Sequence, residues 1–332
     1  MIPRAPQKKE DKKIQSVPLT LIDYRDETFR MSFCPDLGAL KTSMEKIGLI
    51  NPITLRGRGE ERFQIVSGYR RVLAAQSLEW EEIKAALYTS DELSHSDGLL
   101  LTFYENLGTR GFNLIEASMV VAGFFEQWGQ DEKQVREQIL PLLGFQPGRK
   151  IFHALWSISH LSSEWKELVI KNEISLLNAA KISSFSLLDQ RALSTALSGL
   201  KLGENKLRES LEMAEEVCKR DEISLSELFS SEQFKFLGQQ GNLNLTGKTE
   251  QFRKTLKAIR YPEFSRKQQE FHDWRKKLLL PSSVSLEPPD FFEGNKLNVT
   301  FTFRSPEEYR SILKKLETAA ESDVLKNLLM ML

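Results

Sequence analysis

The sequence predicts three consecutive folded regions: an α+β N-terminal domain, an all-α middle domain and a small α/β C-terminal domain. Three observations support this prediction. Short β-branched stretches alternate with helical patterns as far as residue 112. Only helical patterns follow, to about residue 220. After a helical connector, an alternating strand at 297–303 precedes two apolar helical stripes.

The composition is that of a globular chain. Of its 332 residues, 40% are hydrophobic and 28% are charged, which suits two or three domains. The formal net charge is +0, so any argument for nucleic-acid binding has to be local. The predicted parts are a disordered tail at 1–15, a domain at 16–112, a helical domain at 113–220, a connector at 221–279 and a domain at 280–332.

Several classes of protein are disfavoured by the residues present. No run approaches the ~20 apolar residues of a membrane span, and the polar N-terminus lacks the apolar core of a secretory signal. The two cysteines, Cys34 and Cys218, form no ligand pattern, and the four histidines are scattered, which argues against a zinc site. We therefore expect a cytoplasmic protein with reduced thiols and no membrane segment.

The N-terminal domain shows alternating strand and helix patterns. We expect strands at 17–22, 53–56, 63–66 and 83–88, and helices at 35–47, 70–78 and 91–107. Gly48 should end the first helix. The sequence Gly57-Arg-Gly-Glu60 between two strands indicates a hairpin.

The stretch 63–78 combines a strand, a tight turn and the start of a helix. Gly68 permits a sharp turn and a close approach of a ligand to the backbone. Arg70 and Arg71 follow at the helix N-terminus, where free N–H groups and the helix dipole favour anions. Taken alone, this pattern leaves two interpretations open: a phosphate site, or an arginine pair solvated on a surface helix.

The same residues carry a family resemblance. Gly68-Tyr69-Arg70-Arg71-Val72-Leu73-Ala74 resembles the phosphate motif G-E-R-R-x-R-A of ParB/RepB-type partition proteins, whose N-terminal domain is of the ParB/sulfiredoxin-like type. Residues 37–56 resemble the helix, turn and strand before that motif. Glu105-Asn106-Leu107 with Asn113-Leu-Ile-Glu116 resembles the family segment E-N-x-x-R…N-x-x-E.

The resemblance implies a site for CTP with Mg²⁺. It assigns nucleotide binding to Gly68, Arg70, Arg71, Glu105 and Asn106, with Glu105 and Asn106 also as Mg²⁺ ligands. Carboxylate and carbonyl oxygens are suitable ligands for that ion. Glu105 is also the candidate catalytic residue for CTP hydrolysis. Two departures from the family pattern bear on this site: Tyr69 replaces the motif glutamate, and Thr109 replaces an arginine that appears one residue later as Arg110.

The helical region contains a pattern typical of a helix-turn-helix motif. Asn113 and Asp131 are expected to cap helices, Gly144 to make the turn, and Pro147 to open a second helix that buries Ile151, Leu155 and Ile158. Its outer face would then present four candidate DNA contacts: Gln146, Arg149, Lys150 and His153.

An ordinary helical hairpin with a solvated polar face is the alternative. Pro141 favours this alternative, because we expect it inside the first helix, where proline removes a hydrogen bond. Residues 164–180 favour DNA binding, since they resemble the family segment that follows its helix-turn-helix.

The connector changes character along its length. Residues 200–230 are acidic and helical, and Gly238–Gly247 is predicted to be a loop. In 248–277, ten lysines and arginines stand against four acidic residues, with five aromatic residues interleaved. This segment suits either phosphate and base contacts or an amphipathic helix pair whose aromatic rings form a core.

The C-terminal region predicts strands at 283–286 and 297–303, then two helices. Leu297, Val299, Phe301 and Phe303 should form the buried face of the second strand. Ser305-Pro306-Glu307-Glu308 is a helix start. Because a two-stranded sheet is marginal alone, we expect a homodimer through 280–332. This unit resembles the C-terminal dimer module of partition proteins.

The resemblance implies a CTP-gated DNA-binding protein for chromosome or plasmid partitioning, associated with the nucleoid and with a ParA-type ATPase as partner. Two alternatives remain at this point. One is an enzyme on the same fold, either a nuclease or a nucleotide-dependent kinase. A sulfiredoxin is disfavoured because Tyr69 stands where its reactive cysteine would be. The other is a non-catalytic adaptor or transcription regulator.

Overall fold

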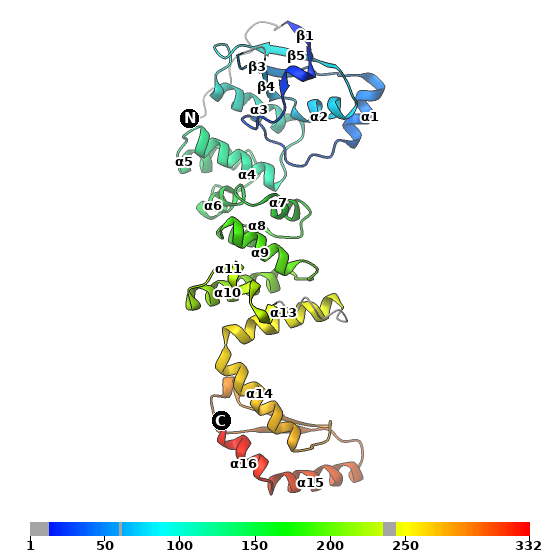
Figure 1. Ribbon diagram of the computed structural model, residues 1–332, viewed down its shortest axis with the longest axis vertical. Coiled ribbons are helices and arrows are strands. Elements are labelled where there is room, and N and C mark those ends of the chain that lie inside the picture. Colours follow the sequence, from blue (N-terminus) through cyan, green and yellow to red (C-terminus); the bar gives the residue numbers. More distant parts are fainter. Residues whose placement is uncertain (1–12, 60–61, 235–243) are drawn as a thin grey trace. The chain divides into compact units, whose positions relative to one another are not determined.

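The computed structural model describes residues 13–59, 62–234 and 244–332 (Figure 1). The chain forms two compact units, Met1–Ser194 and Thr195–Leu332. Residues 1–12 of the expected tail lie outside the described residues, and Ile14 and Gln15 already belong to a strand. Within the described part of the chain, no helix is long and apolar enough to cross a membrane.

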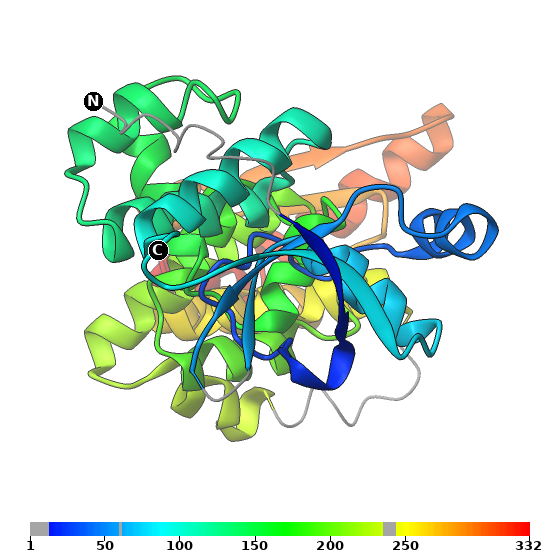
Figure 2. The ribbon, with the colours of Figure 1, turned by 90° about the horizontal axis from the view of Figure 1, so that it is seen from above.

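The first unit begins with a five-stranded mixed sheet in the order β1-β5-β3-β4-β2 (Figure 2). The strands are β1 (Ile14–Pro18), β2 (Ile22–Asp23), β3 (Ile53–Gly57), β4 (Phe63–Ser67) and β5 (Glu82–Tyr88). The predicted hairpin is confirmed, since β3 and β4 pair antiparallel. β3 also pairs with β5, in parallel. The central strands therefore place Ile53 and Leu55 in the core, both fully buried.

Three helices belong to this sheet domain: α1 (Gly38–Ile47), α2 (Tyr69–Ser77) and α3 (His95–Thr109). Gly48 ends α1 as expected, with φ of 74°. Two predicted boundaries are wrong. The strand expected at 17–22 is broken by a 3₁₀ turn at Leu19–Leu21, after a proline that can donate no ladder hydrogen bond. α3 starts after Ser94 rather than at Asp91, because the Ser94 hydroxyl caps the N–H of Asp97 at 3.1 Å.

The rest of the first unit is helical. It contains α4 (Leu114–Ala122), α5 (Glu132–Gln134), α6 (Arg149–Ile158), α7 (Ser163–Ile170), α8 (Leu176–Ser183) and α9 (Leu187–Leu197), which reaches the unit boundary. π-Helical turns at Gly123–Gln127 and Val135–Ile139 extend α4 and α5. The predicted caps at Asn113 and Asp131 are both present as full capping boxes. α4 packs against α6, and α6 against α8.

The α5–α6 connection corrects three expectations. Pro141 lies beyond the end of the first helix, so it interrupts no helix interior. Gly144 turns the chain with φ of 83°, and its N–H donates to Pro141 O at 3.1 Å. α6 begins at Arg149 after an N-cap at Gly148, not in the turn at Pro147. The buried face of α6 contains Phe152 and the expected Leu155 and Ile158, whereas Ile151, which was also expected there, is only half-buried.

The second unit opens with α10 (Glu204–Asp221) and α11 (Leu225–Ser230), followed by α13 (Leu245–Arg260) and α14 (Pro262–Lys277). Of the loop predicted at 238–247, residues 238–243 lie outside the described residues. The remainder is not a loop beyond Asn244, which caps α13, because the helix begins at Leu245. α13 packs along α10, with ion pairs from Arg253 to Glu209 at 2.6 Å and from Arg260 to Glu216.

The aromatic residues of 248–277 divide between core and surface. Phe252 and Phe271 are buried, as the amphipathic-pair hypothesis requires, while Tyr261 is exposed. The ammonium group of Lys277 lies 3.9 Å from the ring centroid of Trp274 at the end of α14. The structure therefore favours the aromatic-core hypothesis for the two buried rings.

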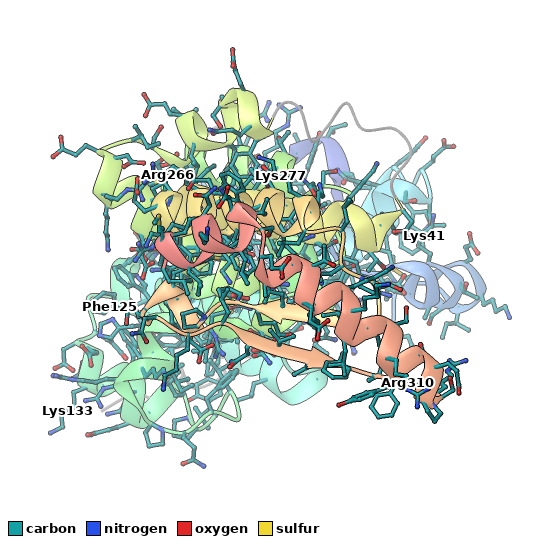
Figure 3. The ribbon with its side chains drawn as sticks, turned by 90° about the horizontal axis from the view of Figure 1, so that it is seen from below. Lys41, Phe125, Lys133, Arg266, Lys277 and Arg310 are labelled. Atoms are coloured by element: carbon teal, nitrogen blue, oxygen red, sulfur yellow. The ribbon has the colours of Figure 1, made fainter. Side chains whose placement is uncertain are left out.

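The chain ends in the predicted β-β-α-α order. β6 (Val284–Glu287) pairs antiparallel with β7 (Asn298–Phe301), and α15 (Pro306–Ala320) and α16 (Asp323–Met330) follow. Figure 3 shows this region from below, with Arg310 on α15 and Lys277 at the end of α14. Phe271, Leu286, Phe292 and Leu328 form its core. The buried face predicted for the second strand is wrong in part, because Val299 and Phe303 are 46% and 52% exposed.

Candidate functional site

The sheet domain contains a cavity of ≈ 550 Å³. Its walls come from the loop before α1, from α1 itself, from the turn 48–51, from the β4–α2 junction and from α3. All five residues that the resemblance assigned to nucleotide binding line it: Gly68, Arg70, Arg71, Glu105 and Asn106. The fold thus gathers two segments that are more than thirty residues apart in sequence.

Gly68 sits at the sharpest point of the β4–α2 junction. It is the N-cap of α2 with φ of 96°, a backbone conformation that only glycine adopts without strain. A Cβ atom here would lie 2.5 Å from Ile53 Cγ2. No side chain in the described residues caps α2, and the N–H groups of Arg71 and Val72 donate to Gly68 O at 2.8 and 3.0 Å. The N–H groups of Tyr69 and Arg70 are therefore the ones at this helix start that suit an anion.

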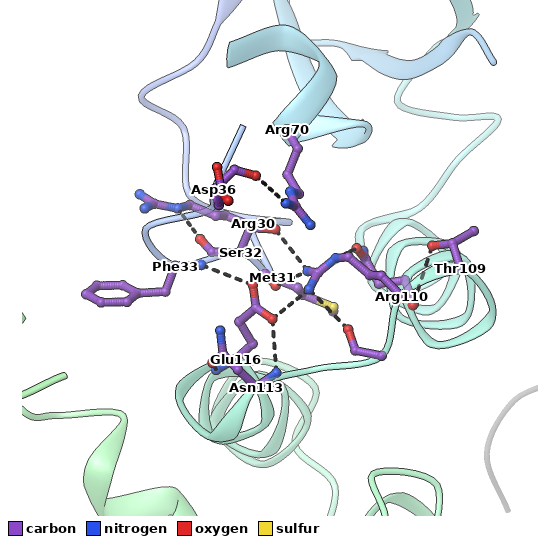
Figure 4. Close-up of polar contacts among 12 residues, drawn as sticks. Arg30, Met31, Ser32, Phe33, Asp36, Arg70, Thr109, Arg110, Asn113 and Glu116 are labelled. Atoms are coloured by element: carbon purple, nitrogen blue, oxygen red, sulfur yellow. Dashed lines mark hydrogen bonds and ion pairs between the residues drawn. The ribbon is translucent and has the colours of Figure 1, made fainter. Parts of the chain in front are cut away.

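Arg70 and Arg71 are adjacent but differ in their partners. Arg71 is engaged on both terminal nitrogens: Nη1 donates to Asn51 O at 2.8 Å and Pro52 O at 3.0 Å, and Nη2 pairs with Glu105 at 2.6 Å. Arg70 Nη2 donates to Asp36 O at 2.6 Å (Figure 4). Its Nε is buried and has no hydrogen-bond partner in the described residues. Arg70 therefore carries the unsatisfied donor of the pair.

Glu105 and Asn106 have their oxygens occupied. Glu105 Oε1 accepts from Arg71, and Oε2 accepts from the hydroxyl of the buried Ser67. Asn106 Oδ1 accepts from Arg110 Nε at 2.8 Å, and its Nδ2 donates to Thr102 O. Within the described residues, no group of three or more His, Cys, Asp or Glu side chains is arranged to hold a metal ion. In this conformation the donor set does not fit Mg²⁺.

Arg110 is a cavity residue that the sequence analysis did not assign. It pairs with Glu116 at 2.6 Å, and its Nη2 donates to Met31 O at 2.9 Å and to the Ser32 hydroxyl at 3.0 Å (Figure 4). Thr109 ends α3, with its hydroxyl bonded to Glu105 O at 2.7 Å. Because Arg110 leaves the helix, its guanidinium reaches both the loop before α1 and the start of α4. The signal in the sequence was an arginine one residue after its expected position.

The loop before α1 carries its own cationic and aromatic contacts. The guanidinium of Arg30 lies 5.0 Å from the centroid of the Tyr69 ring, the residue that replaces the motif glutamate. Lys166 of α7 approaches the Phe33 ring at 5.9 Å. Burial lowers the pKa of Lys166; the nearby charge of Glu27 opposes this shift and that of Arg30 adds to it. The helical region thus contacts the loop that forms one wall of the cavity.

The four candidate DNA contacts form a separate group. Gln146, Arg149, Lys150 and His153 are all exposed, in the turn before α6 and on its first turns, and none of them lines the cavity. Arg149 and His153 pair with Glu132 at 3.2 Å and 3.5 Å. Gln146 and Lys150 have no side-chain partner in the part of the chain that the structure describes.

Comparisons with known proteins converge on one family. Residues 4–106 match the ParB N-terminal domain family. A nucleoid occlusion protein of Geobacillus kaustophilus is 29% identical over 121 residues, covering 36% of this chain and 42% of that protein. A probable chromosome-partitioning protein ParB of Neisseria meningitidis is 30% identical over 104 residues, covering 31% and 35%. The chain thus spans less than half the length of these curated relatives.

The chain also resembles solved structures, of which one contains a bound nucleotide analogue. It is the C-terminally truncated chromosome-partitioning protein ParB of Caulobacter crescentus complexed with CTP-gamma-S, 21% identical to this chain. The alignment covers 55% of this chain and 97% of that one, with a TM-score of 0.27, which is too low to support a shared arrangement across the chain.

Proposed function

We propose that this chain, whose residues 4–106 match the ParB N-terminal domain family, is a divergent ParB-type protein. It binds a nucleotide in the sheet domain and DNA through its helical region. The resemblance specifies CTP as the nucleotide and partitioning of a chromosome or plasmid as the process. One observation carries the nucleotide half: the cavity of ≈ 550 Å³ that gathers Gly68, Arg70, Arg71, Glu105 and Asn106. Its volume is in the range of sites for small ligands.

The β4–α2 junction and its two arginines have distinct roles in this proposal. The backbone at Gly68 and the open first turn of α2 receive phosphate oxygens. Arg70 supplies the unsatisfied guanidinium nitrogen, and a charge-assisted contact from it fixes the phosphates. Arg71 is a positioning residue, because it ties the turn at Asn51 and Pro52 to Glu105.

Mg²⁺, if bound with the nucleotide, would neutralise phosphate charge, and Glu105 and Asn106 are the residues expected to hold it. Their oxygens are engaged by Arg71, Ser67 and Arg110. The residues as arranged do not fit the ion, so the proposal covers nucleotide binding and assigns no hydrolytic step.

The DNA half rests on the helix pair 131–158. The capped helix α5 and the helix α6, joined through the Gly144 turn, support a helix-turn-helix. Four exposed residues lie on the second helix and the turn before it: Gln146, Arg149, Lys150 and His153. This is the position from which recognition helices contact base edges. Association with the nucleoid, a homodimer through 280–332 and a ParA-type ATPase as partner complete the proposal.

Calorimetric titration of the full chain with CTP, ATP, GTP and UTP tests the nucleotide half. We expect saturable binding of CTP, measured with and without magnesium and with and without duplex DNA. The absence of affinity for all four nucleotides under every condition would reject the nucleotide site and favour a non-catalytic adaptor. Hydrolysis of a DNA duplex in the same mixtures would favour a nuclease.

A further inference from the structure

Two arginines and a histidine, Arg136, Arg149 and His153, converge on the carboxylate of Glu132. Its Oε1 lies 3.2 Å from Nε of both Arg136 and Arg149, and its Oε2 lies 3.5 Å from His153 Nε2. Glu132 is the first residue of α5, directly after Asp131, which forms a capping box with Gln134. The backbone that carries the carboxylate is therefore fixed at the point where α5 faces α6.

The three side chains differ in exposure. The side chain of Arg136 is 19% exposed and that of Glu132 is 26% exposed, whereas Arg149 and His153 are 76% and 56% exposed. Glu132 Oε1 and Arg136 Nε are buried atoms without a hydrogen-bond partner in the described residues, so the contacts of this carboxylate with the two arginines, at 3.2 Å, are ion pairs rather than hydrogen bonds. Two of the four candidate DNA contacts are restrained in this way, while Gln146 and Lys150 have no such partner in the described residues.

We propose that Glu132 is a specificity-determining positioning residue of the DNA-binding face. This inference rests on the proposed DNA-binding function. Glu132 holds Arg149 and His153 in one orientation towards the groove, and it competes with backbone phosphates for the Arg149 guanidinium. A restrained arginine loses less conformational freedom when it meets the correct base edge, and a phosphate in any other register has to displace a carboxylate.

The expected effects on stability and on DNA affinity distinguish this positioning role from a role in folding. Ion pairs to side chains as exposed as Arg149 and His153 contribute little to stability, and a glutamine at position 132 keeps an oxygen acceptor beside Arg136, so we expect Glu132→Gln to leave the helix pair folded. Non-specific affinity for DNA depends more strongly on free cations, because each phosphate contact changes the slope of log K against log salt by about 0.9. Releasing Arg149 from its carboxylate should therefore be detected as DNA binding rather than as unfolding.

The test compares Glu132→Gln with Glu137→Gln. Glu137 lies about one helical turn away, is exposed and has no ion pair in the described residues. Glu137→Gln therefore removes one negative charge, as Glu132→Gln does, without breaking an ion pair to α6. Fluorescence anisotropy measures binding to a duplex of random sequence between about 50 and 200 mM salt. We expect Glu132→Gln to bind roughly tenfold more tightly at about 0.1 M salt and with a steeper salt slope, by about one phosphate contact. Glu137→Gln should change both quantities much less.

A second set of variants gives an independent measure. In an Arg149→Gln background, Glu132→Gln should lose most of its effect, because the side chain that it releases is absent. A melting temperature that matches the wild type confirms that both proteins are folded. If a folded Glu132→Gln behaves like Glu137→Gln while the wild type binds DNA, this inference is wrong and the DNA-binding face stands. If the wild type has no affinity for duplex DNA, the proposed DNA function and this inference both fail.

Discussion

The two motif arginines show how identical side chains at neighbouring positions acquire different roles. Position 71 directs its guanidinium inward, to the carbonyls of the 51–52 turn and to Glu105. The guanidinium of Arg70 donates from Nη2 to the carbonyl oxygen of Asp36, and its Nε is buried without a hydrogen-bond partner in the described residues. A buried donor without a partner is costly, so a bound phosphate would satisfy a group that the free protein leaves unpaired.

Replacing each arginine should separate these roles. Arg70→Ala should weaken nucleotide binding about tenfold or more, since a hydrogen bond to a charged group contributes about 1.5–3 kcal/mol, and its melting temperature should match the wild type. Arg71→Ala should weaken binding and also lower the melting temperature, because Glu105 loses its cation. Calorimetry and thermal unfolding measure the two quantities. Undiminished affinity in Arg70→Ala would contradict the assignment.

Gly68 supplies a residue-scale prediction on stability. Gly68→Ala should lower the free energy of unfolding by more than 1 kcal/mol, because the new Cβ would lie 2.5 Å from Ile53 Cγ2 and the φ of 96° is strained for alanine. Denaturant unfolding measures this. Gly108→Ala is the control, because its Cβ meets open space at a position inside α3. Equal effects of the two substitutions would show that the junction tolerates a side chain.

At the scale of elements, local chemistry could be predicted where the deciding groups are close in sequence. The capping boxes at Asn113 and Asp131 and the stop at Gly48 each depend on residues within one helical turn. The division of 17–22 into a strand, a 3₁₀ turn and a second strand could not be predicted, because it depends on the pairing of β1 with β5 and of β2 with β4.

The same limit applies to the cavity. Five of its residues followed from a motif, whereas Arg110 depends on α3 ending at Thr109 and on a loop some eighty residues earlier in the chain. The partners of Arg71 and Glu105 are likewise set by tertiary packing. Sequence could therefore predict the five motif residues of this site, but neither Arg110 nor which donors of the motif residues are already occupied.

The α6 face gives the element-scale prediction. Arg149→Ala or Lys150→Ala should act in one of two ways. Loss of a base contact should cost about 1–3 kcal/mol and relax sequence preference at one position, while loss of a phosphate contact should weaken all sequences alike and flatten the salt dependence. Genomic footprinting of the double variant measures the first effect and salt titration the second. A footprint unchanged from the wild type would support the ordinary helical hairpin.

At the scale of the whole molecule, the C-terminal domain has an apolar surface that no other described residue covers. Phe301, Phe303 and Tyr309 form a cluster of rings with centroids 4.9 to 6.3 Å apart. Val299, Phe303, Tyr309 and Leu313 are each more than a third exposed. Exposed apolar patches of this kind mark association surfaces, and a two-stranded sheet gains most from a partner at its edge. A second copy of this domain is the partner that the proposed homodimer requires.

The dimer is best tested by substitution at this surface. Deletion of 280–332 would also remove Leu286 and Leu328 from Phe271 of α14, so a loss of assembly there could reflect a damaged core. Val299→Lys with Phe303→Lys changes only exposed side chains, and we expect this variant to keep its helical circular dichroism and to become a monomer in light scattering. Leu279→Lys, which is 83% exposed and outside the ring cluster, serves as the control and should remain a dimer. A wild-type chain that is monomeric at tens of micromolar would refute the dimer, and a Val299→Lys, Phe303→Lys protein that still dimerises would move the interface to another surface.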